Sequence, residues 1–119
     1  MAAAGRRAHA GGMNSVQIRT TVHDYDGWKA AFDKYERFRE EHGVRSYRVL
    51  RRADDENDVQ VILDFDDEAA AADLRGRLEQ ILTTPQSQAV AVSHEGPVLL
   101  EVVGRQSCSR VGGGPVRLR

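Results

Sequence analysis

Four stretches of the chain carry the residue pattern of β-strands. Residues 16–23 alternate between apolar and polar side chains and are rich in β-branched residues, which favours a strand with one buried face. Residues 44–52 and 59–65 predict two more strands, and the acidic segment 53–58 between them predicts a turn because Asn and Asp tolerate turn conformations. Residues 98–103 predict a fourth strand.

Apolar side chains recur every three or four residues between these strands, which predicts helices. The first helix follows Asp24, a good N-cap, and ends at Gly43, which can adopt the left-handed conformation. The second follows Asp66 or Asp67. Thr84 and the proline after it predict a short extra helical turn with Thr84 as its N-cap.

The predicted order of elements is β-α-β-β-α-β, the order of a ferredoxin-like α+β domain. Right-handed crossovers place both helices on one face of a four-stranded antiparallel sheet and leave the other face uncovered. We expect this domain to span residues 16–103, between a disordered N-terminal tail, 1–15, and a disordered basic C-terminal tail, 104–119. Translation is expected to start at Met13.

Charge and cysteine content limit the kinds of partner. Residues 16–103 hold 11 basic and all 18 acidic residues, a net charge of −7, and the tails hold six arginines. An acidic domain argues against nucleic acid as the main partner, since phosphate contacts need a basic face. No apolar run is long enough to span a membrane, and a single cysteine, Cys108, excludes an internal disulfide and fits a cytoplasmic protein.

Strand alternation assigns side chains to the two faces of the sheet. The face under the helices is expected to take Val16, Ile18, Val22, Val59, Val61, Leu63, Phe65, Val98, Leu100 and Val102. The uncovered face is expected to take Gln17, Arg19, Thr21, His23, Ser46, Arg48, Leu50, Arg52, Gln60, Ile62, Asp64, Leu99, Glu101 and Val103. This mixed face favours a face-to-face homodimer, or a barrel around a partly polar cavity.

Several short motifs give the chain a family resemblance. They are Asp24-Tyr-Asp-Gly-Trp28-Lys, Phe32-Asp, Gly43-Val-Arg-Ser-Tyr47-Arg-Val, Asp54-Asp55 with Asn57, Phe65-Asp-Asp, Thr84-Pro85 and Gly96-Pro97. In these the chain resembles the dimeric α+β barrel superfamily, small ferredoxin-like domains of the cyclase-like and antibiotic-biosynthesis-monooxygenase-like kinds. The resemblance implies a homodimer in which two sheets face each other.

Members of that superfamily include cofactor-free quinone-forming oxygenases, haem-degrading enzymes, polyketide cyclases and ligand-sensing domains, so the resemblance does not select an activity. The Asn, Trp and His set of the haem-degrading members is not matched, because Asn57 falls in a turn. The Asn, Trp and Tyr set of the oxygenases is not matched either, because Trp28 is on a helix and Asn14 precedes the domain. We expect no cofactor.

Two residues are candidates for catalysis. His23 ends the first strand on the uncovered side, and a neutral imidazole there is a suitable general base. Asp64 is expected to face the same space. The structural alternatives are a strand-end polar residue for His23 and an ion pair that fixes dimer register for Asp64.

Four residues are candidates for ligand binding: Arg19, Arg48, Glu101 and Trp28. Ion pairing across a dimer interface and core packing are their structural alternatives. No metal site is expected, since the histidines lack metal-ligand spacing. Two functions remain open: a cofactor-independent cyclase or monooxygenase acting on an aromatic or polyketide-like small molecule, and a non-catalytic ligand-binding or structural dimer.

Overall fold

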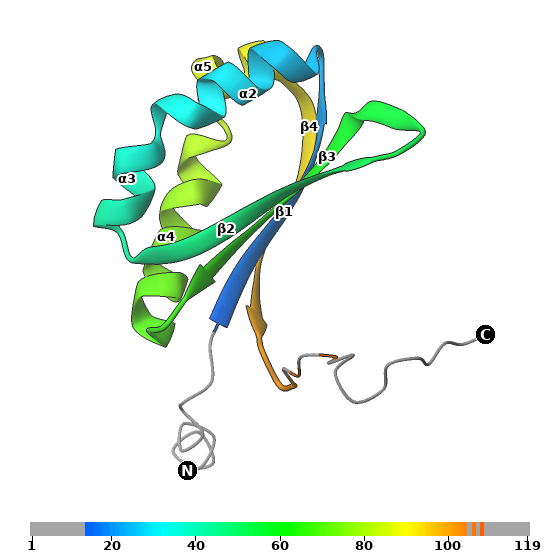
Figure 1. Cartoon of the computed structure of the whole chain (residues 1–119). Coiled ribbons are helices and arrows are strands. Elements are labelled where there is room, and N and C mark those ends of the chain that lie inside the picture. Colours follow the sequence, from blue (N-terminus) through cyan, green and yellow to red (C-terminus); the bar gives the residue numbers. More distant parts are fainter. Residues whose placement is uncertain (1–13, 105, 107, 109–119) are drawn as a thin grey trace, which may run out of the picture.

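The computed structural model describes residues 14–104, 106 and 108, and contains one antiparallel sheet of four strands. The strands are β1 (Asn14–Val22), β2 (Val44–Arg52), β3 (Asp55–Phe65) and β4 (Ala91–Glu101), and their order in the sheet is β2-β3-β1-β4. The helices are α2 (Tyr25–Lys34), α3 (Glu36–Glu41), α4 (Glu68–Ile81) and α5 (Pro85–Val90). All four lie on one face of the sheet, and the other face is uncovered (Figure 1). The predicted ferredoxin-like α+β fold is confirmed.

The ends of the domain differ slightly from the predicted bounds. The first strand begins at Asn14, two residues before the predicted start of the domain. Residues 1–13, 105, 107 and 109–119, to which most of the predicted tails belong, lie outside the described residues. No helix in the described part of the chain is both long and apolar enough to cross a membrane.

Side-chain caps start three of the helices where the sequence predicts them. The carboxylate of Asp24 accepts a hydrogen bond from the backbone N–H of Gly27 at 2.9 Å. Asp67, and not Asp66, caps α4 by accepting from the N–H of Ala69 at 3.0 Å. Thr84 caps α5, as the Thr-Pro pair indicates.

The core lies between the two central strands and the helices. Val16, Ile18 and Val22 of β1 are almost fully buried, and so are the alternate residues of β3 from Val59 to Phe65. From the helix side the core receives Trp28 of α2 with Ala71 and Leu74 of α4. The predicted inward faces of these two strands are therefore correct.

The single helix predicted up to Gly43 is broken at Tyr35 into α2 and α3. The side chain of Arg39 is buried, and its guanidinium donates to the Phe32 carbonyl at 2.9 Å while lying 3.7 Å from the centre of the Phe32 ring. The N–H of Tyr35 donates to the same carbonyl at 3.1 Å, in the tighter three-residue pattern. Arg39 also lies 4.8 Å from the centre of the Tyr47 ring in β2, and the break has no local sequence marker such as Pro.

The face prediction for the last strand was wrong. Val16 pairs with Leu99 and Gln17 with Val98, so Leu99 packs on the core while Val98 and Leu100 are 50% and 38% exposed on the uncovered face. Val98-Leu99-Leu100 is an uninterrupted apolar run, and such a run carries no alternation from which to read its faces. The strand also begins seven residues before the predicted 98, at Ala91.

An irregularity in β4 separates its two halves. Gln17 pairs with Val98 but Arg19 pairs with Glu95, so two residues, Gly96 and Pro97, oppose one residue of β1. This is the geometry of a β-bulge. Gly96 has φ +99°, a conformation that favours glycine. The bulge keeps both His94 and Pro97 on the helix side of the sheet.

Candidate functional site

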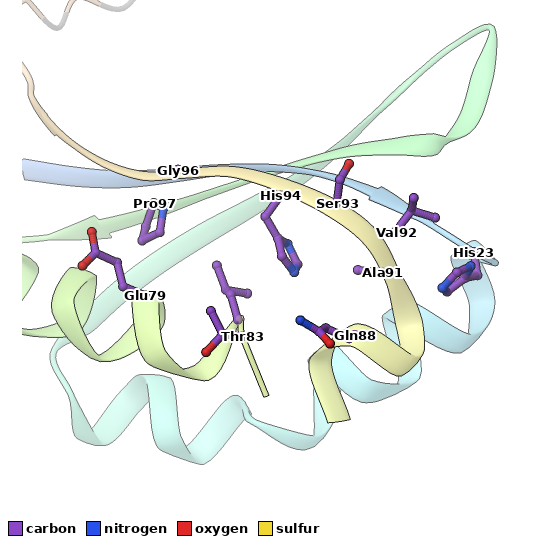
Figure 2. Close-up of a pocket in the computed structure, with 11 residues that line it drawn as sticks. His23, Glu79, Thr83, Gln88, Ala91, Val92, Ser93, His94, Gly96 and Pro97 are labelled. Atoms are coloured by element: carbon purple, nitrogen blue, oxygen red, sulfur yellow. The ribbon is translucent and has the colours of Figure 1, made fainter. Parts of the chain in front are cut away.

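A cavity of about 600 Å³ lies between the edge strand β4 and the helices. It is lined by His23, Glu79, Leu82, Thr83, Gln88, Ala91, Val92, Ser93, His94, Gly96 and Pro97. Figure 2 shows His94 projecting from β4 toward Thr83 and Gln88, with His23 at one end of the row. The volume is in the range of small-molecule sites. The cavity is on the helix side of the sheet, whereas the residue pattern predicts a site on the uncovered side.

His94 is held by hydrogen bonds on both ring nitrogens. Its Nδ1 lies 3.1 Å from the hydroxyl oxygen of Thr20, which is its pairing partner in β1. The same hydroxyl donates to the carbonyl of Ser93 at 2.9 Å. On the other side of the ring, Nε2 lies 3.4 Å from the hydroxyl oxygen of Ser87 in α5.

Burial lowers the pKa of the His94 imidazole below its ordinary value of 6.5, because removal of water disfavours the charged ring. The ring is therefore neutral at pH 7. A neutral imidazole can accept a proton or serve as a hydrogen-bond partner for a ligand, and it imposes no charge on the cavity. Glu79 and His23 are the other titratable residues in the lining.

Three of the predicted site residues lie on the uncovered face, as expected. Arg19 forms an ion pair of 2.7 Å with Asp58, and the hydrogen bonds of this pair hold the pKa of the Asp58 carboxyl below its usual value. Asp64 accepts hydrogen bonds from the hydroxyls of its two neighbours across the sheet, Ser15 at 2.6 Å and Ser46 at 3.3 Å. Arg48 is exposed opposite Ile62.

The two predicted catalytic residues are far apart within one chain. Asp64 pairs with Ser15 near the start of β1, and His23 follows the end of the same strand. At roughly 3.3 Å per residue, the strand separates Ser15 from His23 by about 26 Å. His23 is exposed, and its backbone N–H donates to the carbonyl of Val90 at 3.2 Å beside the cavity. His23 and Asp64 therefore do not form one site in a single protomer.

Two predicted ligand-binding residues lie elsewhere. Glu101 pairs with Asn14, which is opposite the buried Phe65. Glu101 is therefore at a position of β4 that faces the helix side of the sheet, and not the uncovered side as predicted. Its side chain is exposed because β4 ends there. Trp28 is 8% exposed and stacks on Phe32 with ring centres 5.1 Å apart, so it belongs to the core, the structural alternative raised for it.

His94 and Thr20 were not among the predicted site residues. The predicted fourth strand begins only at residue 98, so His94 lies outside the strands predicted from the sequence. Thr20 is 3% exposed, a polar residue at an inward position between Ile18 and Val22. A buried threonine in an otherwise apolar alternation must find a hydrogen-bond partner, and that signal was available in the sequence.

Among the described residues, 14–104 with 106 and 108, no three His, Cys, Asp or Glu side chains lie together in a way that could hold a metal ion. The lining of the cavity contains the imidazoles of His94 and His23, hydroxyl, amide and aliphatic groups, and the carboxylate of Glu79 on α4.

Comparison with known proteins gives matches of structure and none of sequence. No protein-family model matches the chain, and no curated protein does. Among solved structures it is similar to SnoaB, a cofactor-independent oxygenase from Streptomyces nogalater, with a TM-score of 0.55 and 19% identity over 81% of this chain and 96% of that one. The chain therefore shares the ferredoxin-like α+β fold of this structure.

Two dimeric ferredoxin-like proteins from an uncultured marine organism also have a similar fold. One has a TM-score of 0.59 and 5% identity, over 84% of this chain and 96% of that chain. The other has a TM-score of 0.56 and 11% identity, over 80% of this chain and 99% of that chain. At these identities the likeness establishes the fold alone, and it confirms the resemblance seen in the sequence motifs.

Proposed function

We propose that the protein is a small homodimeric enzyme, a cofactor-independent oxygenase or cyclase, that acts on an aromatic or polyketide-like small molecule in the cavity beside β4. The observation that carries the proposal is the neutral His94 in the wall of a cavity of about 600 Å³. The fold it shares with a cofactor-independent oxygenase supports the reaction class. No cofactor is part of the proposal.

Homodimer formation is proposed through the uncovered face of the sheet. Three large apolar residues, Leu50, Val98 and Leu100, are between 38% and 50% exposed there. Removing them from water is worth roughly 25 cal/mol per Å² of apolar surface. The two marine proteins of the same fold are dimeric, which supports the same arrangement here.

The dimer is tested with a matched pair of charge insertions. Val98→Lys places an ammonium group on the uncovered face, and Tyr35→Lys places one at a site of similar exposure, 49% against 50%, in the helix layer. By analytical ultracentrifugation we expect the wild type and Tyr35→Lys to sediment as dimers and Val98→Lys to dissociate. A monomeric wild type, or dissociation caused equally by both variants, would remove the proposed interface.

Catalysis is tested with anthrone and 1-naphthol as probes in air-saturated buffer. We expect oxygen uptake or a cyclised or oxidised product by mass spectrometry, and slower turnover in Gln88→Trp, which places a bulky side chain at an exposed position of the cavity wall. Gln80→Trp, at an exposed site of α4 outside the lining, is the control. Equal turnover in the wild type and both variants would mean that the reaction does not take place in this cavity.

A second candidate, a non-catalytic ligand-binding dimer, is favoured by one observation. The residues predicted to be catalytic, His23 and Asp64, are not together, and Trp28 is occupied in the core. If anthrone or 1-naphthol binds at the cavity but is recovered unchanged, this second candidate accounts for the protein better than the enzyme does.

A further inference from the structure

We infer that His94 is a general base in the cavity, that its Nε2 atom takes a proton from a bound carbon or oxygen acid, and that Thr20 is the positioning residue that fixes the ring in the required tautomer. This inference deepens the proposed function and rests on it, because it assigns chemistry to the same cavity.

The hydrogen bonds of Thr20 determine the tautomer of His94. A hydroxyl has one proton to donate, and the Thr20 hydroxyl lies 2.9 Å from the Ser93 carbonyl, which can only accept. The proton of Thr20 therefore points to Ser93, and the Thr20 oxygen must accept from Nδ1 of His94 at 3.1 Å. Nδ1 carries the hydrogen, and the lone pair of the neutral ring is left on Nε2.

The lone pair on Nε2 is held only by a weak contact. Among the described residues, the Nε2 atom has a hydrogen-bond contact with the Ser87 hydroxyl at 3.4 Å, a long and weak contact that a ligand can replace. Figure 2 shows the His94 ring projecting into the space between β4 and the segment that carries Thr83 and Gln88. A bound molecule in this space would meet the basic nitrogen first.

The chemistry of the lining indicates the class of substrate. The lining offers neutral hydrogen-bonding groups on Thr83 and Gln88 and apolar groups on Ala91 and Pro97, and the Ser87 hydroxyl lies 3.4 Å from the ring. Such a site fits a neutral molecule with one acidic C–H or O–H, such as a hydroxyarene or a β-dicarbonyl compound. The acid loses its proton to Nε2, its bonding electron pair remains on the substrate as an enolate or phenolate, and Nδ1–H of the new imidazolium stays bonded to Thr20.

The two other titratable groups of the cavity are at its periphery. His23 is exposed at the end of β1, and Glu79 is exposed on α4. Neither has a hydrogen bond or ion pair with His94. The loss of rate on acidification should therefore follow the pKa of His94, which burial lowers below 6.5.

The test uses 5-nitrobenzisoxazole, a neutral aromatic probe that reports any accessible base. The base removes the ring C–H proton, the carbon and nitrogen form a nitrile, and the N–O bond breaks to leave a coloured phenolate. We expect His94→Gln to lower the rate constant by about 100-fold or more, in the range of general-base effects. His42→Gln, which removes a histidine outside the cavity, should leave the rate unchanged.

Thr20 is tested separately from His94 by substitutions of similar size. Thr20→Val keeps the shape but removes the acceptor of Nδ1–H, so we expect a several-fold lower rate, a rate–pH midpoint moved to lower pH, and ¹⁵N NMR signals of mixed tautomers for His94. Thr20→Ser retains the hydroxyl and should restore all three properties. A merely structural threonine would change stability without changing the tautomer signal.

The outcomes separate this inference from the proposed function. A His94→Gln variant with the wild-type rate, or NMR signals that place the hydrogen on Nε2, would overturn the inference even if anthrone is turned over. Cleavage of the probe that depends on His94, with the hydrogen on Nδ1, would support the inference even if neither anthrone nor 1-naphthol reacts, and the oxygenase or cyclase proposal alone would then fail.

Discussion

The geometry of the bulge in β4 can be tested by adding one methyl group at Gly96. In Gly96→Ala, an added Cβ would lie 2.7 Å from the Gln17 carbonyl oxygen and 3.1 Å from the backbone nitrogen of Val98. Both contacts are with backbone atoms of paired strands, which cannot move aside as a flexible side chain could. The residue would also have to keep φ near +99°, where L-amino acids other than glycine are strained.

Backbone strain and overpacking together set the size of the expected loss of stability. A residue other than glycine in this backbone region costs of the order of 1–3 kcal/mol, and overpacking against fixed atoms typically costs another 1–3 kcal/mol. We therefore expect Gly96→Ala to lower the free energy of unfolding by about 2–6 kcal/mol. With a urea slope of about 1–2 kcal/mol per molar, the midpoint would move down by roughly 1–6 M.

The assay is urea unfolding followed by the fluorescence of Trp28, the single tryptophan, at a fixed protein concentration because a dimer's stability depends on it. Gly76→Ala is the matched control: it lies within α4, and its added Cβ meets no atom within 4 Å. There we expect a gain of roughly 0.5–1 kcal/mol, because alanine is the better helix former. Equal midpoints for Gly96→Ala and the wild type would refute the bulge geometry.

Three further predictions concern the core, pH and the uncovered face. Leu74→Ala, at a fully buried position of α4, should lower the free energy of unfolding by about 3–5 kcal/mol in the same urea assay. Since the pKa of His94 is lower in the folded chain, the unfolded chain binds more protons below about pH 6.5, so stability should fall as pH drops from 6.5 through the folded pKa. This loss should be smaller in His94→Gln and retained in His23→Gln. Arg19→Met, which removes an ion pair whose arginine is 43% exposed, should change stability by no more than about 1 kcal/mol in the same assay.

The sequence predicted the layout of the fold because the two central strands alternate clearly. The buried positions of β1 and β3, the N-caps Asp24 and Thr84, and the uncovered sheet face all follow from local patterns. The prediction failed for the edge strand β4. Its apolar run has no alternation, and its first half carries polar residues and a bulge that only pairing with β1 defines.

The candidate site was missed for the same reason. Because the predicted fourth strand begins at residue 98, His94 has no predicted pairing partner in the sheet, and His23 is the histidine that lies on a predicted strand. The pairing of Thr20 with His94 is a contact between two strands distant in sequence, and only their register shows it. The predicted residues on the uncovered face were placed correctly where alternation was clear, at Arg19, Arg48 and Asp64.

The central claim is that a homodimer binds a small molecule in the cavity beside His94, and native mass spectrometry of the full chain with 1-naphthol tests it most directly. We predict a mass of two chains that gains up to two ligand masses, with the gain reduced in Gln88→Trp and kept in Gln80→Trp. A monomer, or a dimer that gains no ligand mass from either 1-naphthol or anthrone, would contradict the account.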